Sequence, residues 1–267
     1  FFSLASTMAE SPKPLKRKRV VVVMYDTLCR HFLPSYGNEW IKAPNFERLS
    51  KLSVQFQNFY VGSMPCMPAR REMHTGRYNF LHRAWGPLEP FDDSMPQTLH
   101  LNGIHSHKVT DHHHYWEDGG ATFHQRYTTF DLVRGQEGDK WVGDVDKLKD
   151  TKYGANHWPE NAVLPMQRQD KINREHMKAN EDMPQHKTFS LGLEFLERNH
   201  DAKNDWYLQI ETFDPHEPFF TQQEFQDLYP HEYAGPPFDW PPYREVREDD
   251  ETVEHIRYMY ASLISFC

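Results

Sequence analysis

Long apolar runs, separated by segments with helical periodicity, form the framework of this chain. Residues 19–25 are a continuous β-branched run that ends at Asp26, and residues 206–213 are a second apolar run. Uninterrupted runs of this kind are typical of parallel strands that are buried on both faces. Residues 104–109 are expected to form a short strand, and the alternating pattern at residues 54–60 predicts another.

Four segments between and after these runs predict helices. Apolar residues recur with helical spacing in residues 46–52, 188–199 and 251–266, and residues 95–102 are expected to form another helix. Thr188 is the expected N-cap of its helix. The alternation of strands and helices indicates an α/β fold, with a mostly parallel central sheet flanked by helices.

Asp26 stands at the carboxyl end of the first predicted strand. Functional residues gather at this edge of parallel sheets, so the position favours a metal-binding or catalytic carboxylate. The simpler interpretation is an N-cap for the segment that follows. The predicted strands at residues 104–109 and 206–213 lead at the same edge to Thr110 and to His216, which makes both side chains candidates for the same site.

Composition narrows the setting in which this site works. The chain has 267 residues and a net charge of -9, which argues against a nucleic-acid partner. No apolar run reaches the ~20 residues of a membrane span, and three cysteines provide no disulfide framework. A cytoplasmic location is therefore expected. Residues 1–18 contain a basic run and are expected to be a flexible lead to one domain at residues 19–267.

The densest chemical signal is the segment Cys66-Met67-Pro68-Ala69-Arg70, followed by Gly76-Arg77. Arg70 lies one helical turn after Cys66, and Gly76 is a typical helix C-cap. Cys66 is thus expected at a helix N-terminus, where free N–H groups and the helix dipole favour an anion. The guanidinium can bind two oxygens of that anion. These features predict a site for a tetrahedral oxyanion, whereas the simpler interpretation is a buried thiol.

This motif resembles the signature of the sulfatase family, in which the cysteine is oxidised after synthesis to formylglycine. Residues 213–219, Phe-Asp-Pro-His-Glu-Pro-Phe, resemble the family's leaving-group histidine motif. The resemblance implies an alkaline-phosphatase-like fold, a catalytic domain at residues 19–267 and hydrolysis of a sulfate ester. It also implies maturation by a formylglycine-generating enzyme. Cys66, as formylglycine, would be the nucleophile and a metal ligand; Arg70 would stabilise the anion and His216 would protonate the leaving alkoxide.

The residues around Asp26 resemble the metal-binding entry of the same family, which implies that this carboxylate binds a divalent cation. Oxygen ligands suit a hard ion, with Ca²⁺ expected first and Mg²⁺ or Mn²⁺ as the other candidates. Many relatives carry a second Asp beside the first, but Tyr25 stands there in this chain. The metal therefore gains one ligand from this strand, an arrangement closer to the phosphonate monoester hydrolase branch. The implied substrate is a small-molecule or carbohydrate sulfate ester.

The family places an anion-binding pair near the end of the third strand, which makes Thr110, His112 and His114 candidates for substrate binding. His82 is a further candidate, although solvation at the surface explains it equally well. The triplet of residues 112–114 also suggests zinc. Successive residues of a strand point to opposite sides, so we expect that the three imidazoles do not share one ion.

Two alternatives remain open at this stage. A phosphonate monoester hydrolase or phosphodiesterase on the same site agrees with the Tyr25-Asp26 pair. A family member would continue to another strand with an Asp-His or Asp-Asn metal pair, so the chain is expected to be the N-terminal part of a longer enzyme. As given, it would then be a catalytically incomplete fragment or an anion-binding protein with unmodified Cys66, because metal affinity rises with ligand count.

Overall fold

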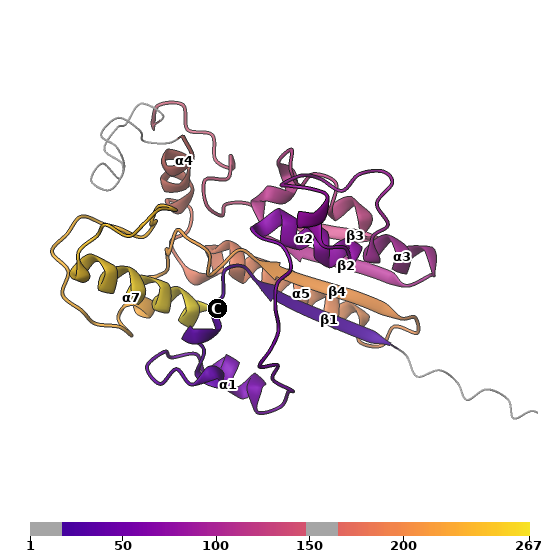
Figure 1. The fold of residues 1–267 in the computed structure, drawn as a ribbon, viewed down its shortest axis with the longest axis horizontal. Helices are drawn as coiled ribbons and strands as arrows, with labels where there is room; N and C mark the ends of the chain where they lie inside the picture. The colour runs from indigo at the N-terminus through magenta and orange to yellow at the C-terminus, as the bar shows by residue number, and fades with distance from the viewer. Residues whose placement is uncertain (1–17, 148–164) are drawn as a thin grey trace, which may run out of the picture.

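A computed structural model describes residues 18–147 and 165–267 of the chain. Within these ranges, four parallel strands form one sheet in the order β1-β4-β2-β3 (Figure 1). The strands are β1 (Arg19–Tyr25), β2 (His105–Thr110), β3 (Thr129–Leu132) and β4 (Trp206–Thr212). The predicted α/β fold and three of the predicted strands are confirmed, and β3 is a strand that the apolar pattern does not reveal.

Seven α-helices accompany this sheet in the described ranges. They are α1 (Pro44–Ser50), α2 (Cys66–Thr75), α3 (Met95–Leu101), α4 (Pro165–Arg174), α5 (Pro184–Asn199), α6 (Gln223–Gln226) and α7 (Asp250–Phe266). The four helices expected from periodicity correspond to α1, α3, α5 and α7. The predicted cap at Thr188 is wrong, because α5 begins at Pro184 with Met183 as N-cap and Thr188 is buried inside the helix. Proline is tolerated at that first turn because its missing N–H would have no helical partner.

One face of the sheet packs on α5 through apolar side chains. Val109 of β2 and Leu208 and Ile210 of β4 are buried in one cluster with Phe195 of α5. A Cβ at Gly192 of α5 would lie 2.4 Å from the Ile210 side chain, so only glycine permits this close approach of helix and strand. Burial of this apolar surface anchors the central strands on one side.

The opposite face of the same two strands is polar although it is fully buried. Lys108 of β2 and Gln209 and Glu211 of β4 have no exposed surface. The Glu211 carboxylate accepts hydrogen bonds from the Lys108 ammonium at 2.8 Å, from the Gln209 amide at 2.8 Å and from the Tyr115 hydroxyl at 2.9 Å. A buried carboxylate is tolerated only where donors and opposite charges surround it. Glu211 has both.

Helix α2 covers this polar face and is tied to it by two side chains. Arg70 donates from Nε to Glu211 at 2.9 Å. One turn later, the Nε2 atom of buried His74 lies 3.1 Å from the Tyr127 hydroxyl, which in turn donates to Gln209 at 2.6 Å. These contacts fix the position of α2 over the sheet.

The segment that follows β1 is fixed by α7, which lies at the carboxyl ends of the strands (Figure 1). The Tyr260 hydroxyl of α7 donates to the Thr27 carbonyl at 2.6 Å and accepts from the Cys29 N–H at 2.8 Å. Leu263 of the same helix is fully buried in a cluster that also contains Phe219. Helix α7 therefore holds the segment after β1 by hydrogen bonds and packs against the segment after β4.

The sequence predicted that β1 is buried on both faces, and this prediction is wrong. In the described ranges β1 is an edge strand. Val20, Val21 and Val23 are 47%, 44% and 44% exposed, whereas every residue of β4 is buried. The difference follows from strand order, because β4 has a strand on each side and β1 has only β4. A local apolar run predicts a strand but does not show where in the sheet that strand lies.

Residues 54–60 form no strand, contrary to the prediction. Backbone carbonyls in this segment accept side-chain hydrogen bonds from Arg30 at 2.8 Å and from Tyr36 at 2.9 Å. Phe59 and Tyr60, on opposite sides of the alternating pattern, are 82% and 83% exposed. An alternating pattern becomes a strand only when another strand pairs with its backbone, and within the described ranges none does.

The lead predicted at residues 1–18 lies outside the described residues, apart from Lys18. In the part of the chain that the structure describes, no helix combines the length and the apolar character needed to cross a membrane.

We expect the network around Glu211 to make the protein sensitive to acid. Burial by itself raises the pKa of Glu211, but the Lys108 and Arg70 charges outweigh burial and hold that pKa well below its usual value. The stability that this carboxylate contributes is thus present above its unfolded pKa of about 4.3 and is lost as the pH falls below it. Glu211→Gln should lower the free energy of unfolding at pH 7 by about 3–5 kcal/mol, because buried Lys108 loses its carboxylate partner and buried Arg70 loses one of its two.

Urea unfolding at pH 7 and at pH 4 would measure both effects. The variant should lose less stability than the wild type between these pH values. Glu197→Gln, at an exposed position of α5, is the matched control and should change stability by less than about 0.5 kcal/mol. An equal pH dependence in wild type and Glu211→Gln would contradict the role given to this carboxylate.

Candidate active site

Asp26 follows β1 directly, and its N–H still donates to the Thr212 carbonyl of β4 at 3.0 Å. Its carboxylate is buried, with one oxygen 2.9 Å from the Arg70 guanidinium and 3.0 Å from the His112 ring. The other oxygen accepts from the Thr27 hydroxyl at 2.8 Å. Burial alone raises the pKa of Asp26, but the Arg70 charge and the His112 hydrogen bond together hold that pKa well below its usual value. The carboxylate is therefore ionised at neutral pH.

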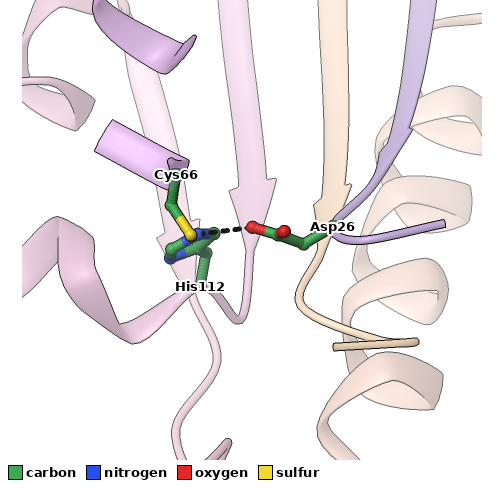
Figure 2. Close-up of side chains that lie close together, drawn as sticks. All are labelled: Asp26, Cys66 and His112. Carbon is green, nitrogen blue, oxygen red and sulfur yellow. Dashed lines mark hydrogen bonds and ion pairs between the residues drawn. The ribbon is translucent and has the colours of Figure 1, made fainter. Parts of the chain in front are cut away.

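Cys66 is the first residue of α2, as predicted, and the helix ends at Gly76 in the left-handed conformation expected of a C-cap. The cysteine side chain points toward the Asp26 carboxylate and the His112 ring (Figure 2). One ligand atom of each of these three residues lies within 4.8 Å of the other two. The structure thus brings the helix N-terminus and the end of the first strand together, and we call the cluster of side chains around Asp26, Cys66 and His112 the pocket.

The environment of Cys66 suppresses ionisation of its thiol. Burial, followed by the nearby Asp26 charge, raises the pKa of Cys66 to about 12, although Arg70 acts in the opposite direction. Reactive cysteines normally have a lowered pKa, because the thiolate is the nucleophile. This thiol is therefore protonated at neutral pH and is a poor nucleophile as it stands.

Arg70 is buried between two carboxylates. Its Nε atom donates to Glu211, and its Nη2 atom lies 2.9 Å from Asp26 without the geometry of a hydrogen bond. The guanidinium also reaches the Cys66 carbonyl from Nη1, at the long distance of 3.5 Å. A buried guanidinium nitrogen without a hydrogen bond is a donor that an oxyanion in this pocket can use.

His112 and Thr110 are both buried near the end of β2. The pKa of His112 is lowered to about 4, first by burial and then by the Arg70 charge. The ring is thus neutral at pH 7 and donates from Nε2 to Asp26, while its Nδ1 atom is buried without a hydrogen-bond partner. The Thr110 hydroxyl accepts from the His112 N–H at 3.1 Å and so helps to hold the ring in place.

His216 is buried just beyond β4 and stacks near Phe213, with ring centroids 4.3 Å apart. Its Nδ1 atom donates to the Glu217 carbonyl at 2.7 Å, and its Nε2 atom lies 3.4 Å from the Tyr243 hydroxyl. His216 also acts electrostatically on Asp26, whose pKa it helps to lower. These contacts fix the orientation of the imidazole near the pocket.

The remaining two predicted substrate-binding residues lie in different surroundings. His82 is exposed, and its Nε2 atom lies 2.8 Å from Arg71, which forms a buried ion pair with Asp92. His82 thus lies beside the Arg71–Asp92 ion pair. His114 donates from Nδ1 to Glu117 at 2.6 Å, with its ring centroid 5.2 Å from that of His112.

Sequence reasoning missed the charged and polar groups that support the pocket. Glu211 lies within β4, where the signal was a charged residue inside a mostly apolar strand, whereas Lys108 lies in β2, whose sequence is mostly polar and gives no such signal. Tyr243 lies in a loop without periodicity, and its phenol is near both Glu217 and Cys66. No local pattern marks that position.

Donors in the pocket agree with a divalent cation. Asp26 supplies an ionised buried oxygen, His112 a neutral imidazole with an unsatisfied nitrogen, and position 66 a side chain directed at both. Oxygen from a formylglycine at position 66 would replace sulfur in this set and give it the hard character that Ca²⁺, Mg²⁺ or Mn²⁺ prefer. The residues present thus fit a metal, with one carboxylate in the described set.

Comparison with known proteins finds sulfatases among the proteins that are similar to this chain. The chain is 24% identical over 224 residues to a choline-sulfatase of Rhizobium meliloti. The matched region covers 80% of this chain and 41% of that protein. It is 23% identical over 258 residues to the iduronate 2-sulfatase of Homo sapiens, covering 87% of this chain and 43% of that protein. The chain thus spans about two fifths of the length of these relatives.

Among solved structures, a phosphonate monoester hydrolase of Agrobacterium radiobacter is similar in fold, with a TM-score of 0.60 and 17% identity. The likeness covers 94% of this chain and 57% of that one, and it confirms the predicted alkaline-phosphatase-like fold. The family model named Sulfatase matches residues 18–259, nearly the whole chain. With Cys66, Arg70 and Asp26 converging in one pocket, this match shows that the chain belongs to the sulfatase family.

Proposed function

We propose that the protein hydrolyses sulfate esters and that position 66 carries its nucleophile as formylglycine. One observation carries this proposal: Cys66 begins a helix and points at an ionised carboxylate beside a buried guanidinium. A sulfate group needs a nucleophile, compensation of the charge on its oxygens and an acid for the leaving oxygen. The pocket holds a candidate residue for each of these roles.

The raised pKa of the Cys66 thiol, about 12, argues against direct cysteine catalysis. At neutral pH almost none of this thiol is ionised, so an unmodified Cys66 would react slowly, because only the thiolate is the nucleophile. Oxidation to formylglycine by the maturation enzyme would remove that limit, because the nucleophile would no longer depend on thiol ionisation. When bound, a divalent cation and the hydrated aldehyde would supply charge neutralisation and the attacking hydroxyl.

Arg70 is the residue that we assign to the sulfate oxygens. Its charge is held in the pocket by Glu211, and its Nη2 atom has no hydrogen bond in the structure. The free N–H groups of the first turn of α2 lie at the same end of the helix and favour the same anion. We assign Asp26, in turn, to the cation.

His216 is the residue that we assign to the leaving group. The Glu217 carbonyl holds its Nδ1–H, so Nε2 is the atom that would deliver a proton to the departing alkoxide. The Tyr243 hydroxyl, 3.4 Å from Nε2, would orient this atom or return its proton. Departure of an alkoxide needs such an acid far more than departure of a stabilised phenolate.

The proposed substrate is a small-molecule or carbohydrate sulfate ester, because the similar proteins are named for choline and iduronate sulfates. Turnover of an aryl sulfate and of the matching aryl phosphonate by the purified full-length protein would test the reaction class. A higher kcat/KM for the sulfate is expected. Turnover of the phosphonate alone would favour a phosphonate monoester hydrolase instead.

Mass spectrometry of the tryptic peptide that ends at Arg70 tests the nucleophile. From a host with the formylglycine-generating enzyme, we expect the aldehyde at position 66 and an unmodified thiol at Cys29 in the same digest. Any unmodified Cys66 should react with iodoacetamide at pH 8 about 1,000-fold more slowly than an ordinary thiol, since its thiolate is that much rarer. A fully retained thiol in such a host would contradict the proposed mechanism.

Substitution of His216 tests the leaving-group acid. His216→Ala should lower kcat/KM for an alkyl sulfate by about 10²–10⁴-fold, and much less for a nitrophenyl sulfate, whose leaving group needs no proton. His200→Ala, at an exposed position, is the control and should change neither rate. An equal loss on both substrates would assign His216 to binding or structure rather than to proton transfer.

A further inference from the structure

The histidine triplet at residues 112–114 is divided between two groups of side chains. His112 faces Asp26 and Cys66, whereas His113 and His114 face Glu137, which lies in the loop after β3. The prediction that the three imidazoles do not share one ion assumed the geometry of an extended strand. Instead, His113 begins a 3-10 turn, His113–Trp116, which places two consecutive imidazoles on the same side. Their ring centroids are 4.1 Å apart.

We propose that His113, His114 and Glu137 bind a zinc ion, at a site beside the Asp26 pocket and separate from it. One ligand atom from each of the three residues lies within 4.8 Å of the other two. Two imidazoles and one carboxylate are a common zinc ligand set, which leaves the fourth tetrahedral position for water or another ligand. Nitrogen-rich donors favour zinc over Ca²⁺ or Mg²⁺.

The unsatisfied polar atoms of this cluster are independent evidence for a ligand. His113 is 2% exposed, and neither of its ring nitrogens has a hydrogen-bond partner. Its Nε2 atom lies 3.1 Å from Oε2 of buried Glu137, which also has no hydrogen bond. Buried polar groups are normally paired, so two that face each other without a bond need an explanation. Their separation is close to the roughly 3.3 Å between neighbouring ligands of a tetrahedral zinc ion with bonds near 2.0–2.1 Å.

His114 completes the set with a supporting carboxylate. Its Nδ1 atom donates to Glu117 at 2.6 Å, which assigns Nε2 to the metal. Zinc-bound histidines commonly donate their other nitrogen to a carboxylate in this way, and that bond fixes the orientation of the ring. Glu117 also lies 3.7 Å from Nε2 of His113, so its charge faces both imidazoles.

The charges around Glu137 favour a cation as well. The carboxylates of Glu217, Asp170 and Glu117 all act electrostatically on Glu137 and make its surroundings negative. Arg134, whose positive charge acts on His113, is already bound by Asp139 at 2.7 and 2.8 Å. A divalent ion would offset this excess of negative charge.

Zinc binding to the metal-stripped, purified protein tests the proposal directly. Titration against a chromophoric chelator, with elemental analysis after gel filtration, should show one tightly bound zinc ion per chain. Glu137→Gln and His113→Asn should each lower the affinity for this ion by at least about 100-fold, since each removes a ligand. Asp26→Asn should retain it. A Cys66→Ala background should also retain it, so the result does not depend on formylglycine.

The matched control is His255→Asn, which removes one member of an exposed pair whose nitrogens, on His231 and His255, lie 2.8 Å apart. Zinc lost in this control, or lost in Asp26→Asn, would overturn the proposal by assigning the ion elsewhere. Zinc that remains in Glu137→Gln, or the absence of tight binding to the wild type, would do the same. If the variants do not fold, anomalous scattering at the zinc edge from wild-type crystals decides whether the ion lies between His113, His114 and Glu137.

Discussion

The structure depends on one buried carboxylate, Glu211, in the central strand β4. It lies between the Lys108 ammonium and the Arg70 guanidinium, both within 2.9 Å and all three nearly without exposed surface. Burial lowers the pKa of Lys108 only to about 8, because Glu211 opposes the effect of burial, so the ammonium is still charged at neutral pH. Each of the three charges would be costly in this position without the others.

This network links the fold to the chemistry of the pocket. Arg70 belongs to α2, the helix that begins with Cys66, and it contacts Glu211 of the sheet and Asp26 at the end of β1 at the same time. The distance between the helix N-terminus and the strand end is therefore set by a side chain that is itself held by a buried ion pair. An anion entering the pocket would meet a charge that is already oriented, which reduces the reorganisation that binding requires.

The sequence predicted the parts of this site that local rules determine. Cys66 and Asp26 were identifiable because a strand end and a capped helix are visible in short segments, and the structure brings them together. Glu211 was not, because a charged residue in a strand normally indicates an exposed face, and only the fold supplies its partners. The exposure of β1 and the irregular residues 54–60 had the same cause: both depend on which strands lie next to them.

The histidine triplet shows how one turn can serve two kinds of donor set. The end of β2 directs His112 toward Asp26, where a neutral ring lies beside a carboxylate, the Cys66 side chain and an arginine. The 3-10 turn that follows directs His113 and His114 to the other side, where the partner is Glu137. The group around Asp26 and the nitrogen-rich group of His113 and His114 are thus separated by a change of backbone conformation rather than by distance along the chain. Because ligand type selects the metal, adjacent residues can belong to sites of different specificity, and the backbone between them determines which residue belongs to which site.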